Sequence, residues 1–147
     1  MKAQDLRIGD LVQILDEHGD IKTCKVVGID SEKCRNTKTR GFLQGAAKLR
    51  PLDLEEDEPS DWYGCWCEGI EPITLTPEIL VKNGWSKISD SLYNYVPRCD
   101  IFLSLEYVGV GWMVAWDEER IKMREVKYVH ELQHLLWWLG LDAELKI

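Results

Sequence analysis

The stretch YVHELQHLLWWLG, residues 128–140, is the longest helical pattern in the chain. At 100° per residue its aliphatic side chains fall on one stripe, which predicts an amphipathic helix packed on a core. The members of this stripe are Val129, Leu132, Leu135, Leu136 and Leu139. Gly140 indicates the end of the helix, because glycine readily takes the left-handed conformation that follows a last turn.

The same stretch contains His130-Glu131-x-x-His134, the spacing of the zinc-peptidase signature. Two histidines four residues apart project from the same side of a helix, so both rings can bind one zinc ion. In that arrangement the glutamate between them acts as general base on the metal-bound water. The pattern thus makes His130, Glu131 and His134 the candidate residues of a small zinc hydrolase.

A catalytic zinc site also requires a third protein ligand and an open fourth position. The only other histidine is His18, and the only acidic residues after Gly140 are Asp142 and Glu144. We therefore expect no metal, no cofactor and no catalytic residue, and interpret His130 and His134 as a surface pair opposite the aliphatic stripe. The zinc hydrolase is kept as an alternative.

Composition indicates a soluble globular protein of 147 residues, with 45% hydrophobic and 30% charged residues. No apolar run approaches the roughly 18 residues that span a bilayer, so we expect no membrane association. The N-terminus is polar and leads directly into structure, which predicts no signal peptide.

The chain has five cysteines, an odd number, and no Cys-x-x-Cys pair. We therefore expect reduced thiols and a cytoplasmic protein.

Three regions follow from the pattern of turns and strands. Residues 1–51 alternate short apolar strands with turn signals about ten residues apart, which predicts a small SH3-like β-barrel or meander. Residues 52–69 form an acidic and then aromatic connecting segment. Residues 70–147 predict a helix, an antiparallel sheet and the final amphipathic helix. The expected fold class is therefore α+β.

The third region carries clear boundary signals. Thr76-Pro77-Glu78 combines a helix cap, a first-turn proline and an acid favoured by the helix dipole. Asn83-Gly84 then ends a helix of about two turns. Strands are predicted at 92–96, where Pro97 stops the first, and at 101–107, 112–116 and 121–123.

Charge is unevenly distributed. Residues 1–50 carry ten Lys and Arg against seven Asp and Glu, whereas residues 51–147 carry eight against nineteen.

Six cationic residues without an intervening acidic residue indicate a hairpin that could contact phosphates. These are Lys33, Arg35, Lys38, Arg40, Lys48 and Arg50. The segment holds a single aromatic residue, Phe42, so stacking platforms for bases are missing. Nucleic-acid binding is therefore an alternative rather than the first interpretation.

Three stretches together carry a family resemblance: DLRIGDLV (5–12), IEPITLTPEILVKNGW (70–85) and VKYVHELQ (126–133). The chain resembles small uncharacterised proteins of gut Bacteroidales and their prophages or mobile elements. In that family the last stretch usually has Gln and Asn where this sequence has Glu131 and His134. The resemblance implies that the zinc-like motif is a chance match, and it implies no activity.

The first functional interpretation is a non-enzymatic interaction module, as expected of a mobile-element or phage-related family. Aromatic residues outside the predicted core are typical of interfaces. These are Trp62, Trp66, Trp137 and Trp138. The expected partner is an unidentified protein or a second copy of the chain.

Overall fold

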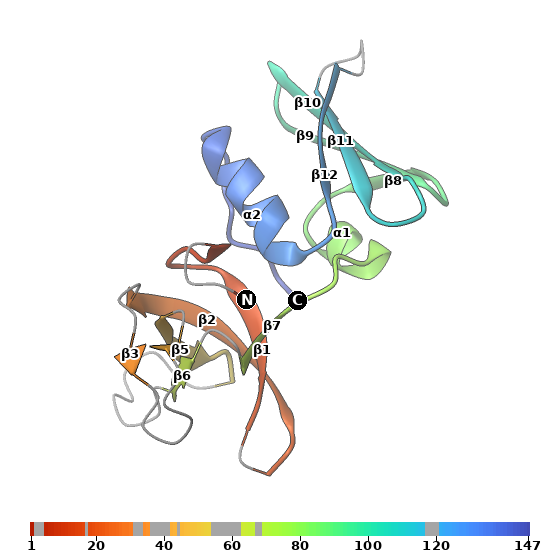
Figure 1. Cartoon of the computed structure of the whole chain (residues 1–147). Coiled ribbons are helices and arrows are strands. Elements are labelled where there is room, and N and C mark those ends of the chain that lie inside the picture. The colour runs from red at the N-terminus through yellow and green to blue at the C-terminus, as the bar shows by residue number, and fades with distance from the viewer. Residues whose placement is uncertain are drawn as a thin grey trace. The chain divides into compact units, whose positions relative to one another are not determined.

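The computed structural model describes residues 1, 5–16, 18–30, 34–35, 42–43, 45–53, 63–66, 69–116 and 121–147. The chain divides into two compact units, Met1–Ile73 and Thr74–Ile147. Figure 1 draws the first unit in red to yellow-green and the second in green to blue. Within the described residues the fold is α+β, with two five-stranded antiparallel sheets and two helices.

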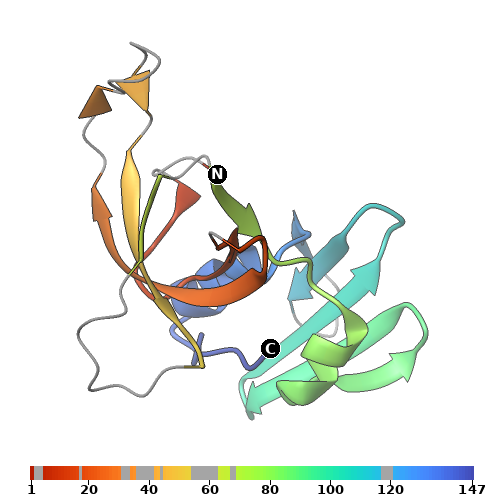
Figure 2. The ribbon, with the colours of Figure 1, turned by 90° about the horizontal axis from the view of Figure 1, so that it is seen from below.

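The first unit is built from strands alone in its described part. Its five-stranded sheet has the order β6-β5-β2-β1-β7, and β3 and β4 pair separately. Figure 2 shows the β3–β4 ribbon beyond the ends of β2 and β5. The strands are β1 (Leu11–Leu15), β2 (Ile21–Asp30), β3 (Cys34–Arg35), β4 (Phe42–Leu43), β5 (Ala46–Pro51), β6 (Tyr63–Trp66) and β7 (Ile70–Pro72).

A tight turn at Arg7–Asp10 leads into β1. The buried Asp10 carboxylate accepts a hydrogen bond from the Arg7 main-chain N–H at 2.7 Å, and Gly9 takes a φ of 100°. This turn is also tied to β2, since Gly9 N donates to Val26 O at 2.7 Å. Alternating apolar residues of the strands then form the core of the unit. The core comprises Leu6, Val12, Ile14, Cys24, Val26, Ala47, Leu49 and Ile70.

The first unit has an antiparallel sheet, as predicted, but the predicted barrel is not closed. Within the described residues β6 and β7 are the two edges of an open sheet. β6 pairs with β5, and β7 pairs with β1 through Val12↔Pro72 and Ile14↔Ile70. The sequence interpretation had assigned these two strands to the connecting segment and to the start of the third region. Their pairing satisfies main-chain groups of β5 and β1, which no local sequence pattern reveals.

The second unit contains both helices. They are α1 (Pro77–Lys82) and α2 (Val129–Trp138). Between them runs an antiparallel meander of order β12-β11-β10-β9-β8, with every strand next to its neighbour in sequence. Its strands are β8 (Ser86–Ser89), β9 (Leu92–Arg98), β10 (Ile101–Tyr107), β11 (Trp112–Trp116) and β12 (Ile121–Val126).

The start of α1 is where the sequence predicts it. Thr76 is the N-cap, its hydroxyl oxygen accepting a hydrogen bond from Ile79 N at 3.4 Å, and Pro77 is the first helical residue. A main-chain hydrogen bond at Glu78, helped by the Thr76 hydroxyl, holds the pKa of the Glu78 carboxyl below its usual value. α1 ends at Lys82, and Gly84 has a φ of 83°. Both boundary predictions are confirmed.

Pro97 does not stop β9, which continues to Arg98. The pairing of β9 with β10 shifts register between Ile101 and Leu103, and Pro97 faces this irregularity. On the other side, the pairing of β9 with β8 already ends at Asn94. The missing N–H of the proline therefore removes no ladder hydrogen bond, which is why the strand accepts it.

The sheet and the segments that precede the two helices are joined inside the unit. Trp112 on β11 is buried, and its indole N–H donates to Leu75 O at 3.1 Å. Leu75 N in turn donates to Lys127 O at 3.0 Å. The starts of α1 and α2 are thus held together, although they lie about fifty residues apart in the chain. None of the described helices is long and apolar enough to cross a membrane.

Candidate functional site

Glu131 has a structural role at the first turn of α2. Its Oε2 accepts hydrogen bonds from Lys127 N at 2.7 Å and from Tyr128 N at 3.1 Å. These N–H groups precede the helix, so the carboxylate closes the turn that begins α2 in the manner of a capping box. The acid that the zinc interpretation requires as a base is engaged with the main chain of its own helix start.

The two histidines are not a surface pair. His130 is buried, with 6% of its side chain exposed, and its ring stacks on Tyr128 with centroids 5.9 Å apart. The ring of His134, which is half-buried, lies edge-on to His130 at 5.7 Å. The prediction of an exposed pair is therefore wrong for His130. The reason is that the buried side of α2 is wider than its aliphatic stripe, because Gln133 is buried as well.

A third metal ligand does not accompany the histidines in the described part of the chain. No three His, Cys, Asp or Glu side chains there come close enough to hold a metal ion. Asp142, the acidic candidate after the helix, accepts a hydrogen bond from Glu144 N at 2.9 Å. Cys24 and Cys99 form no disulfide with each other.

We expect purified, tag-free protein to contain far less than one zinc ion per chain, since two imidazoles alone do not complete a structural or catalytic site. Elemental mass spectrometry on the parent protein and on His134→Asn measures this directly. Equal, low zinc in both proteins is the expected result. One zinc ion per chain in the parent that is lost in His134→Asn would contradict this expectation and would support the zinc-hydrolase alternative.

The tryptophans predicted to form an interaction surface fall into two groups. Trp137 and Trp138 end α2 and are 63% and 71% exposed. Trp66 belongs to β6, an edge strand, and Trp62 lies outside the described residues. The first pair thus lies in the second unit, whereas Trp66 lies in the first.

Most of the predicted phosphate-contacting residues cannot be placed. Lys33, Lys38 and Arg40 lie outside the described residues, and Arg35 is on β3. Lys48 and Arg50 are two apart on β5, exposed and half-buried respectively. That spacing puts both on the same side of their strand.

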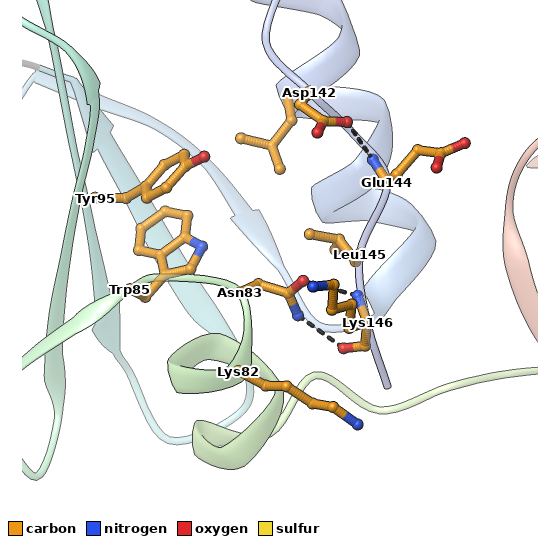
Figure 3. Close-up of a pocket in the computed structure, with 9 residues that line it drawn as sticks. Lys82, Asn83, Trp85, Tyr95, Asp142, Glu144, Leu145 and Lys146 are labelled. Carbon is orange, nitrogen blue, oxygen red and sulfur yellow. Dashed lines mark hydrogen bonds between the residues drawn. The ribbon is translucent and has the colours of Figure 1, made fainter.

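A cavity in the second unit was missed by the sequence interpretation. Its volume is about 200 Å³, and Trp85 and Tyr95 form one wall. Their rings stack with centroids 5.0 Å apart and an interplanar angle of 23°. Leu136 of α2 and Leu145 supply further apolar surface. Figure 3 shows the aromatic pair facing Leu145 across the cavity.

The C-terminal segment 142–147, here called the tail, forms another wall of this cavity. Asn83 holds it: Nδ2 donates to Lys146 O at 2.7 Å, and Oδ1 accepts from Lys146 N at 2.7 Å (Figure 3). Gln133 Nε2 donates to Ala143 O at 3.1 Å, and Lys82 Nζ donates to Ile147 O. The tail has no regular secondary structure, so these side chains fix its position.

The indole nitrogen of Trp85 has an unusual environment. The side chain is 2% exposed, and Nε1 has no hydrogen-bond partner among the described residues. In Figure 3 this nitrogen lies on the ring edge that faces Leu145 and the tail. A buried N–H without an acceptor is costly, about 1–3 kcal/mol, and calls for an explanation.

Comparison with known proteins gives no relative from which a role can be transferred. No family model, curated protein or solved structure matches this chain.

Proposed function

We propose that the chain is a non-enzymatic interaction module that binds a protein partner through Trp137 and Trp138. The observation that carries this proposal is the exposure of two consecutive tryptophans at the end of α2, 63% and 71%. A buried indole removes roughly 150–250 Å² from water, and tryptophan is enriched at interface centres. Their placement on a helix whose other side packs on its own unit supports a preformed docking element.

The chemistry at the start of the same helix also favours binding over catalysis. For Glu131 to act as a base, its carboxylate would have to release the N–H groups of Lys127 and Tyr128. That release would expose main-chain donors at the first turn and weaken α2. A helix that presents a fixed aromatic end needs no such rearrangement.

Replacing both Trp137 and Trp138 by serine is expected to weaken partner binding about 30-fold or more, because interface tryptophans commonly contribute at least 2 kcal/mol. Self-association is measured first, by sedimentation velocity over a wide range of concentrations. If the parent stays monomeric, a photo-crosslinking amino acid at position 138 identifies the partner in cells. The affinity of that purified partner for parent and variant is then measured.

Val110→Ser is the matched control, because Val110 is 68% exposed on the β10–β11 turn of the same unit. It removes exposed apolar surface without touching α2 and should leave binding unchanged. The proposal fails if the parent is monomeric and position 138 gives no discrete adduct. It also fails if the purified partner binds the serine variant as tightly as the parent.

For the first unit we propose an SH3-like arrangement of strands, without closure of the barrel. The support is the order β7-β1-β2-β5-β6, in which the last strand returns to pair with the first. We also propose a cytoplasmic location. Its support is the odd number of cysteines, five, without a Cys-x-x-Cys pair, which suits reduced thiols in a reducing compartment.

A further inference from the structure

We propose that the cavity between Trp85, Tyr95 and the tail is a binding site for a small, uncharged molecule with an aromatic or alicyclic body and one carbonyl group. This site is separate from the Trp137–Trp138 surface and goes beyond the interaction proposed for it. Three observations carry the inference: the Trp85 indole N–H that has no acceptor among the described residues, the aromatic and leucine side chains on part of the cavity wall, and the size of the cavity.

The orphan donor defines the polar requirement of the ligand. Trp85 Nε1 is buried and has no acceptor among the described residues, whereas Nε1 of Trp112, which is also buried, donates to Leu75 O at 3.1 Å. An indole N–H donates and never accepts. The group that completes this site must therefore be an acceptor, and a carbonyl oxygen is a strong acceptor that an uncharged organic ligand can offer.

The walls define the body of the ligand. Leu145 faces the stacked rings of Trp85 and Tyr95 (Figure 3), and Leu136 also lines the cavity, so this part of the wall suits a flat apolar group. The charged residues of the wall are two lysines and two acids, which balance one another. An anion would consequently lose its hydration without a net positive wall to replace it, and a neutral ligand is favoured.

The volume of the cavity limits the size of the ligand. The cavity measures about 200 Å³. An apolar cavity of about 150 Å³ in another protein holds benzene, so one ring with one substituent fits here. Sites for drug-sized ligands start at about 300 Å³, which excludes dinucleotides and similar cofactors.

Benzamide, benzoate and toluene are a matched set of probes, since they share one ring and differ only in the substituent. Binding to the full chain is followed through the indole Hε1 signals of ¹⁵N-labelled protein. We expect benzamide to shift the Trp85 signal downfield and saturably, with a dissociation constant on the order of 1 mM. Benzoate should bind about ten-fold more weakly. Toluene should leave the Trp85 signal without a downfield shift, because it offers no acceptor.

Trp112 is the internal control, because its indole N–H already has an acceptor and its signal should not move. Leu145→Phe, which fills the cavity from the tail, should abolish the benzamide response while the protein remains folded. The proposal is overturned if benzamide leaves the Trp85 signal unmoved. It is equally overturned if benzamide and toluene shift that signal alike, or if Trp112 responds as strongly as Trp85. None of these outcomes bears on binding through Trp137 and Trp138.

Discussion

Leu103→Ala is expected to lower the free energy of unfolding of the second unit by about 2–5 kcal/mol, the range for removing a fully buried leucine. Leu103 lies on β10, the middle strand of the sheet, and its side chain has no exposed surface. It stands opposite Tyr95 of β9 and Trp116 of β11 in the pairing register. The surrounding strands cannot close around the lost methyl groups, so the variant keeps a cavity. Urea unfolding followed by tryptophan fluorescence measures the change.

Ile88→Ala is the control for this variant. Ile88 lies on the edge strand β8 and is 57% exposed, so truncation there should change the stability by no more than about 0.5 kcal/mol. Equal losses for the two variants would mean that the sheet of the second unit is not packed as described.

Trp112→Phe is expected to lower the free energy of unfolding of the second unit by about 2–4 kcal/mol. The substitution removes the donor for the Leu75 carbonyl and leaves that buried oxygen without its partner. It also shortens a ring that packs edge-on against Tyr93 at 5.5 Å and Tyr107 at 5.2 Å. Because Leu75 N is bonded to Lys127 O, the loss should propagate to the segments that precede both helices. Hydrogen exchange of the Leu75 amide should therefore accelerate together with the loss of global stability.

The same chemical change at an exposed position provides the comparison. Trp138→Phe replaces a side chain that is 71% exposed. The free energy of unfolding of this variant should stay within about 0.5 kcal/mol of that of the parent protein. If Trp112→Phe were as mild as Trp138→Phe, the hydrogen bond to Leu75 would have no energetic importance.

Features that depend on neighbouring residues were predictable. Thr76 and Pro77 start α1, and the stripe of Val129, Leu132, Leu135 and Leu136 is buried in α2. Each of these depends on contacts within one or two helical turns. The alternation of Ile101, Leu103 and Leu105 likewise gave β10, because the side chains of a strand alternate between its two faces.

Features that depend on distant parts of the chain were not predictable. Asn83 was correctly read as part of a helix stop, yet its amide also binds Lys146, 63 residues away. The burial of His130 and the position of β7 beside β1 also depend on residues that are distant in the chain. The cavity beside Trp85 depends on the course of the tail, and nothing in the local pattern around Trp85 indicates it.

The bonding of Glu131 has a consequence for how short sequence signatures are read. A glutamate or glutamine at the third position of a helix is selected by the geometry of the first turn, whatever the protein does. Where such a residue has histidines one position before and three after, the geometry of the first turn alone can account for the glutamate of a peptidase signature. The useful discriminator is thus the distance of the acid from the helix start. Searches that record where the helix begins would separate glutamates of a first turn from glutamates inside a helix.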